Sequence, residues 1–258
     1  MRDRKSVQLY SVRDEVSRDR RSTLKRLASM GFTQVEPFGL GNDSASAEER
    51  VADAKAFRRE LDDLGLRVTT AHCSIPADVD SLLAEAKALH VETLVVPNPK
   101  KVPGFNPDIY SSTARITAFA ETLNELSQRF QVNDLALAYH NHEFEWAAAD
   151  GRPGIDLLWE CLDPAVRAQA DIYWAQVGGA YIPSYLMQVA NRLISVHIKN
   201  GPTIRGSDQT PLDHGDVDVK AALNTVGPNI DLVLEIDVTS LDRFELLSSN
   251  FALLSRWT

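Results

Sequence analysis

Short apolar segments alternate with longer amphipathic segments along most of the chain. The short segments are rich in β-branched and aromatic residues, which is typical of buried strands. We predict eight strands on this basis, at residues 7–12, 34–38, 66–72, 93–96, 135–139, 170–174, 193–198 and 232–236.

The segments between the strands carry apolar residues three and four positions apart, as on one face of a helix. Asp78 is placed to cap one of these helices, and Gly31 follows the end of another. Helices are predicted around residues 24–30, 54–64, 78–90, 116–130, 155–162, 184–190 and 244–256.

Alternating strands and helices indicate a parallel sheet with helices outside it. Eight such units in 258 residues favour a single (β/α)₈ TIM barrel, with residues 1–258 as one domain. An open doubly wound sheet is the alternative. It is disfavoured because no G-x-G-x-x-G or P-loop pattern follows the first strand.

Composition and charge narrow the class of protein. The chain is 44% hydrophobic and 24% charged, as in globular proteins, and no apolar run reaches the roughly 18–20 residues of a membrane span. The charged start lacks a signal-peptide core, and Cys73 and Cys161 cannot form a disulfide framework. We therefore expect a cytoplasmic protein. Its net charge of −9 disfavours nucleic acid as a partner.

Polar residues recur at the carboxyl ends of the predicted strands, where a barrel carries its active site. They are Glu36, His72, His140, His142, Asp171, His197, Lys199, Glu235 and Asp237. Buried charges are costly unless paired or bound to a cation, and His, Asp and Glu are ligand types for divalent metals. The pattern predicts one Mn, Co, Mg or Zn ion, provided that the barrel brings these residues together.

Structural roles are the alternative for the histidines. His197 within Val-His-Ile is compatible with a hydrogen-bonded core residue, and the same holds for His72. His140 and His142 lie two apart on a predicted strand and should share a face, with one as ligand and the other as substrate contact. His90 and His214 receive no functional role.

These motifs resemble those of the xylose isomerase-like barrel superfamily, which includes sugar isomerases and epimerases, inosose dehydratases and endonuclease IV. The Tyr-His-Asn-His-x-Phe-Glu element at 139–145 is the most specific part, and it is similar to proteins described as sugar phosphate isomerase/epimerase. The matching segments are Gln8–Asp14, Gly31–Glu36, Ala71–His72, Tyr139–Glu145, Asp171–Trp174, Val196–Lys199 and Leu234–Asp237.

The resemblance implies a divalent ion held by Asp171, His197 and Glu235. Strand five departs from the family pattern, because epimerases place a glutamate there and this chain offers His140 or His142, with Glu145 as a third candidate. Glu235 is implied as the catalytic base. His142 or Glu145 would have to supply the second base that two-sided epimerisation requires.

The implied chemistry is proton abstraction next to a carbonyl of a small sugar, sugar phosphate or keto-polyol, through an enediolate. Return of the proton gives isomerisation or epimerisation. Loss of a β-substituent gives the alternative, a lyase of the inosose dehydratase or 3-keto-glycoside type. Expected substrate contacts are Glu36, His72, Lys199 and Trp174, with Phe38 as a stacking surface.

Two other classes of function remain as alternatives. An endonuclease IV-like nuclease would need more metal ligands and a basic surface, whereas the chain has six histidines and a net charge of −9. A non-catalytic sugar-binding barrel would bind no metal. The sequence leaves the oligomeric state open, with a homo-oligomer as one possibility.

Overall fold

The computed structural model describes residues 4–42 and 44–258. Eight parallel strands form one sheet: β1 (Lys5–Gln8), β2 (Gln34–Glu36), β3 (Thr70–His72), β4 (Thr93–Val96), β5 (Ala136–His140), β8 (Arg167–Asp171), β9 (Leu193–Ile198) and β10 (Asp231–Leu234). Their order is β2-β1-β10-β9-β8-β5-β4-β3. The two outer strands meet through isolated parallel bridges, Gln34 to Arg67 and Leu40 to Cys73, so the barrel is nearly closed.

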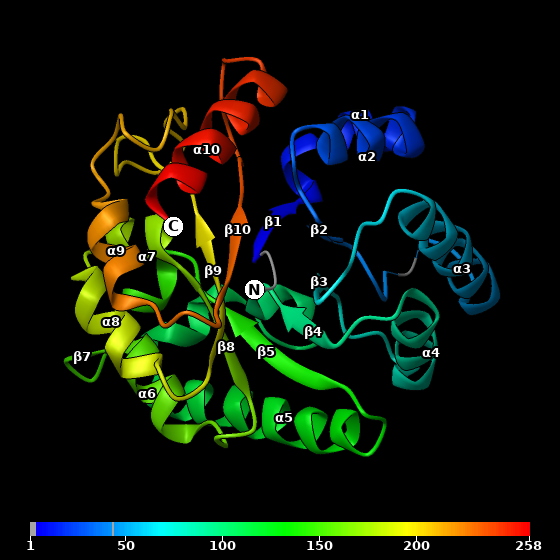
Figure 1. The fold of residues 1–258 in the computed structure, drawn as a ribbon. Helices are drawn as coiled ribbons and strands as arrows, with labels where there is room; N and C mark the ends of the chain where they lie inside the picture. The colour runs from blue at the N-terminus through cyan, green and yellow to red at the C-terminus, as the bar shows by residue number, and fades with distance from the viewer. Residues whose placement is uncertain (1–3, 43) are drawn as a thin grey trace.

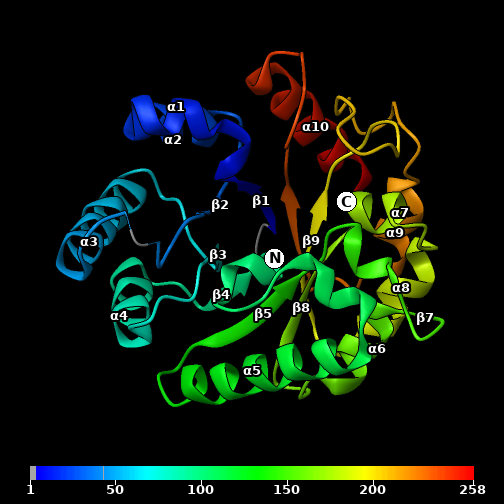
Figure 2. The same cartoon turned by 180° about the vertical axis from the view of Figure 1, so that it is seen from behind.

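Helices surround the strands on the outside, as Figures 1 and 2 show from opposite sides. They are α1 (Arg13–Arg18), α2 (Arg20–Ser29), α3 (Ala47–Asp63), α4 (Val79–Leu89), α5 (Thr113–Gln131), α6 (Gly154–Cys161), α7 (Ile172–Val177), α8 (Ile182–Val189), α9 (Val219–Thr225) and α10 (Arg243–Trp257). Short 3₁₀ helices lie at Leu9–Val12, Pro99–Lys101, Pro107–Ser111 and Phe144–Trp146, and β6 (Ala148–Ala149) pairs with β7 (Arg152–Pro153). This confirms the predicted (β/α)₈ barrel.

Local sequence explains several of these elements. Asp78 caps α4 as predicted, since its side chain accepts from the amides of Asp80 and Ser81. The apolar stripe predicted for α5 is buried from Ile116 to Phe130 against the sheet. Among the described residues, no helix combines the length and apolar character that a membrane span needs.

Three predicted strands are wrong in part. The third, predicted at 66–72, is a strand only from Thr70 to His72, with an isolated bridge at Arg67 before it. The first was expected at 7–12, but the chain turns into a 3₁₀ helix at Leu9, because the Gln8 side chain accepts a hydrogen bond from the Tyr10 amide at 3.2 Å. The sixth was expected at 170–174, but β8 ends at Asp171 and α7 follows. The Asp171 side chain caps α7 by accepting from the Trp174 amide at 2.8 Å. In the first and sixth strands, a local side-chain cap outweighs the strand propensity of the residues that follow.

Candidate metal centre

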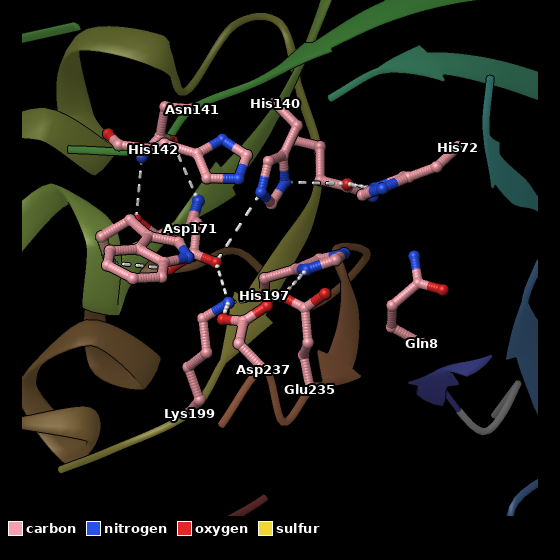
Figure 3. A network of polar contacts seen from close by, with 12 residues as sticks. Gln8, His72, His140, Asn141, His142, Asp171, His197, Lys199, Glu235 and Asp237 are labelled. Carbon is pink, nitrogen blue, oxygen red and sulfur yellow. Dashed lines mark hydrogen bonds and ion pairs between the residues drawn. The ribbon is translucent and has the colours of Figure 1, made fainter. Parts of the chain in front are cut away.

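Four side chains from neighbouring strands converge at the carboxyl end of the barrel (Figure 3). His140 ends β5, Asp171 ends β8, His197 lies near the end of β9, and Glu235 follows β10. One donor atom from each lies within 4.8 Å of every other, and all four residues are buried. The barrel thus brings together the three implied ligands and one of the two strand-five histidines.

His140 presents a free ring nitrogen to this cluster. Its Nδ1 donates to the amide oxygen of Gln169 at 3.0 Å, because that oxygen can only accept. Its Nε2 then carries the lone pair and lies 3.8 Å from Asp171 Oδ2. Burial and the positive charge of His197 hold the pKa of His140 well below its usual range, so the ring is neutral. A neutral imidazole of fixed orientation is what a metal ligand requires.

His197 lies between two carboxylates. Its Nδ1 is 2.8 Å from Glu235 Oε2 and its Nε2 is 2.7 Å from Glu36 Oε1. Although burial opposes the charge, Glu235 and Glu36 raise the pKa of His197 to about 10. With Glu36 holding Nε2, it is Nδ1 that faces the cluster. Nδ1 carries a proton shared with Glu235, which a bound ion would have to displace to reach a carboxylate–histidine–metal arrangement.

Glu36 lies beneath the cluster and is fully buried. Besides His197, its oxygens accept hydrogen bonds from Gln8 and Gln169, both at 2.7 Å, and from Thr70. Burial opposes its ionisation, but the positive charge of His197 lowers the pKa of Glu36 to about 2. In the part of the chain that the structure describes, Glu36 is outside the pocket lining and orients His197 from behind.

Lys199 places its ammonium group among three carboxylates. Its Nζ lies 2.7 Å from Asp171 Oδ2, 2.7 Å from Asp237 Oδ2, and in contact with Glu235 Oε2. Despite the burial, these anions hold the pKa of Lys199 well above its usual range. The same ammonium lies 5.4 Å from the ring of Trp174.

The donor set fits a divalent ion. Two imidazole nitrogens and two carboxylates suit Mn, Co or Zn, and Glu36 and Gln169 supply the outer hydrogen bonds that orient histidine ligands. Asp171 commits Oδ1 to the cap of α7, which leaves Oδ2 directed at the cluster. His140, Asp171, His197 and Glu235 would hold the ion.

A pocket of about 310 Å³ opens above these residues. His140 and Glu235 reach its floor, and His142 lies on its wall. Tyr10 and Phe38 form an edge-to-face pair on its rim, with ring centres 5.4 Å apart, and both are partly exposed. The pocket therefore offers polar groups at depth and flat apolar surface at the mouth, which suits a small polyhydroxylated molecule.

The expectation that His140 and His142 share a strand face does not hold, because β5 ends at His140. The ring of His142 is not one of the four donors, but it stays next to His140, with ring centres 5.0 Å apart, and it stacks on Phe144, with centres 5.4 Å apart. Its Nδ1 is buried and has no hydrogen-bond partner in the structure. Burial and the nearby charge of Lys199 lower the pKa of His142 to about 4.

Glu145 lies outside the four-residue cluster and is fully buried. Its Oε1 accepts from the Tyr139 hydroxyl at 2.7 Å, and its Oε2 accepts from the amide of His142 at 2.9 Å. Burial raises the pKa of Glu145 to about 8, with these hydrogen bonds as a partial offset.

The remaining expected substrate contacts lie at different depths. His72 lines the pocket and hydrogen-bonds to Gln169 at 2.7 Å. Lys199 is buried in the carboxylate cluster, and the ring of Trp174 lies 6.0 Å from that of His142. His214 is exposed, and its side chain is paired with that of its neighbour Asp213.

Sequence reasoning missed two residues that organise the site. Gln169 bonds both His72 and His140 through one oxygen, and Asn141 bonds the backbone of Asp171. Gln169 could have been found by alternation, since it lies two residues before Asp171 and therefore on the same strand face. Asn141 carried no comparable signal beyond its place between two histidines.

Residues 24–254 match the family model described as xylose isomerase-like TIM barrel. Solved structures agree with the fold. A sugar phosphate isomerase/epimerase from Parabacteroides distasonis is 20% identical with a TM-score of 0.75, and covers 98% of this chain and 94% of its own. A probable 3-DHS dehydratase from Bacillus anthracis is 13% identical with a TM-score of 0.71, and covers 98% of each chain. No curated protein shows significant sequence similarity to the chain.

Proposed function

Because the chain belongs to the xylose isomerase-like TIM barrel family, we propose that it is a divalent-metal-dependent isomerase or epimerase of a small sugar or keto-polyol. The observation that carries this proposal is the convergence of four buried donor residues, two of which, His140 and Glu235, line a pocket of about 310 Å³. The reaction is proton abstraction from the carbon next to a carbonyl.

A divalent ion held by these residues supplies a Lewis acid, which stabilises negative charge on the substrate carbonyl oxygen. The chain supplies the proton transfers. Glu235 reaches the pocket and is ionised, because the positive charges of Lys199 and His197 outweigh its burial and keep its pKa well below the usual range. Such a carboxylate is a weak base, so it suits only a C–H bond that an adjacent carbonyl makes acidic.

His142 is the second group that we assign to proton transfer. It is neutral, lines the pocket, and has a ring nitrogen without a partner. Glu145 accepts from the amide of His142, so we assign it to holding that residue in place. Tyr10 and Phe38 provide the flat surface for a sugar ring.

One observation favours the lyase as a second candidate. Strand five contributes His140 to the cluster, and its Nδ1 is engaged with Gln169, so this strand provides no carboxylate base beside the ion. Elimination needs only one carboxylate base: Glu235 removes the proton next to the carbonyl and can pass it to the departing hydroxyl, which leaves as water.

Hydrogen exchange at carbon tests the proposal without knowledge of the product. Keto-sugars and inososes are incubated in D₂O with enzyme and added Mn²⁺. We expect deuterium at the carbon next to the carbonyl for at least one substrate, and the products then distinguish isomerisation from elimination. Absence of exchange across the set, with the metal shown to be bound, contradicts the proposal.

A further inference from the structure

The ammonium of Lys199 lies where a bound ion would have to find its ligands. Its Nζ is 2.7 Å from Asp171 Oδ2 and contacts Glu235 Oε2, and these two residues belong to the four-donor cluster. The side chain of Lys199 is 1% exposed, so water does not screen the charge of its ammonium group. The two carboxylates already have a cation between them.

Charge explains why a cation is needed at this point. Asp171 and Glu235 offer oxygens within 4.8 Å of each other in a buried site, where unpaired carboxylates are costly. A divalent ion and an ammonium cannot both lie between them, since like charges at such short range repel strongly in a poorly solvated site. Either cation satisfies the carboxylates, and each excludes the other.

The structure also shows where the ammonium would go. Asp237 Oδ2 is 2.7 Å from Nζ and is the most exposed of the three carboxylates, with its side chain 21% accessible. It lines the pocket and is itself held by Gln209 through two hydrogen bonds, of 3.1 and 2.7 Å. A short rotation of the flexible lysine side chain would keep the contact with Asp237 and break the contacts with Asp171 and Glu235.

We propose that Lys199 is a built-in competitor for the metal: its ammonium group and a divalent ion are alternative occupants of the position between Asp171 and Glu235. When metal binds, the ammonium keeps its contact with Asp237, which lines the pocket, and loses those with Asp171 and Glu235. The inference rests on the metal site of the proposed function and adds a property to it. The competition raises the dissociation constant of every divalent ion by the same factor, so ions of low intrinsic affinity leave the site to the lysine.

The test compares metal affinity in metal-free protein. Mn²⁺ and Co²⁺ alone are titrated by calorimetry into wild type, Lys199→Met and, as a matched control, Lys101→Met, which removes an exposed lysine that lines the same pocket. If the lysine leaves the ligands free in only 1–10% of molecules, we expect Lys199→Met to bind about 10–100-fold more tightly. Lys101→Met should bind as wild type does.

Trp174 provides a second readout, because its ring lies 5.4 Å from Nζ. Mn²⁺ binding should change the tryptophan emission of wild type, and Trp174→Phe should abolish most of that change. If Lys199→Met folds only with metal, its thermal midpoint should rise with Mn²⁺ far more than that of wild type, which also supports the proposal.

Failure of this inference and failure of the proposed function are separable. If Lys199→Met binds metal no more tightly than wild type, and metal-bound wild type is active, the competition is overturned and the proposed enzyme activity is not affected. If Lys199→Met binds metal and wild type does not, the result supports the competition and contradicts a metal-dependent reaction in the wild-type protein. Absence of binding in both proteins overturns both.

Discussion

Asn141 and Asp171 are joined by two hydrogen bonds between the side chain of one and the backbone of the other. Asn141 Nδ2 donates to the Asp171 carbonyl at 3.0 Å, and the Asp171 amide donates to Asn141 Oδ1 at 2.9 Å. The Tyr185 hydroxyl also donates to that Oδ1 at 2.9 Å. Because Asn141 follows His140 directly, this bridge fixes the end of β5 against the end of β8 and sets the spacing of two candidate ligands.

Replacing Asn141 with Ala should weaken metal binding. The change leaves the Asp171 backbone unbridged, and loss of an outer partner of this kind typically costs about 10–100-fold in metal affinity. Buried groups left unpaired should also lower the free energy of unfolding by ~1–3 kcal/mol. Calorimetric titration with Mn²⁺ and denaturant unfolding measure the two effects.

Asn124 offers a matched control. On α5 it makes the same kind of double bridge, from Nδ2 to the Cys161 carbonyl at 3.1 Å and from the Asp163 amide to Oδ1 at 2.7 Å. Asn124→Ala should reduce stability without changing metal affinity. If both variants weaken metal binding equally, the bridge at Asn141 has no specific role in positioning Asp171.

Replacing Glu235 with Gln should separate catalysis from metal binding. The amide keeps the shape but loses the charge and the basicity, so metal affinity falls and excess Mn²⁺ restores occupancy by mass action. Activity should remain ~10²–10⁴-fold below wild type even at saturating metal, because the general base is gone. His214→Gln, which alters an exposed loop residue, should keep activity within a few-fold.

The decisive measurement is turnover of Glu235→Gln with the metal site filled. A rate near that of wild type under this condition would assign the base to another residue. His142 is then the first to examine, because it lines the same pocket.

The pH dependence of stability should report Glu145. Its pKa is about 8 in the folded protein against an ordinary 4.5, so the folded state keeps a proton that the unfolded state releases between these values. The unfolded state therefore binds fewer protons in this window, and this group lowers the free energy of unfolding by up to ~1.4 kcal/mol per pH unit as the pH rises from 4.5 to 8.

Glu145→Gln cannot titrate and should become more stable relative to wild type as the pH rises through this window. Denaturant unfolding at pH 5 and pH 8 gives the comparison, with Glu121→Gln on the exposed face of α5 as control. A constant difference between Glu145→Gln and wild type across this range means that Glu145 has the same pKa in both states.

Metal removal should lower the melting temperature. An ion that binds only the folded state at 100 times its dissociation constant adds ~2.7 kcal/mol. Chelated protein should therefore melt below Mn²⁺-loaded protein, and Asp171→Asn should show a much smaller difference. Identical melting of chelated and Mn²⁺-treated wild type argues that this cluster takes up no ion.

The sequence predicts the barrel well because its repeating pattern is long and redundant. β9 has the predicted bounds, Leu193–Ile198, since an uninterrupted apolar run leaves little choice of register. β8 is displaced because Ile172, Tyr173 and Trp174 favour a strand locally, whereas the Asp171 cap turns them into a helix. Whether a side chain caps the next helix depends on its orientation, which the sequence pattern does not contain.

The site is predictable in its residue types but less so in their contacts. Alternation places Asp171 and His197 on the inner face, and the structure brings them together. It cannot place His142, which lies beyond the end of β5, nor show that Lys199 spans carboxylates from two strands. Such contacts depend on distances between neighbouring strands, which a linear pattern does not contain.

The cap that Asp171 provides for α7 ties local folding to the candidate metal centre. α7 has six residues, too few to be stable as an isolated helix, and its first turn depends on the carboxylate whose other oxygen faces the cluster. Whatever loosens Asp171 also frays α7, so the two should open together as one cooperative unit. The hydrogen-exchange rate of the Trp174 amide should therefore report how often the cation site opens.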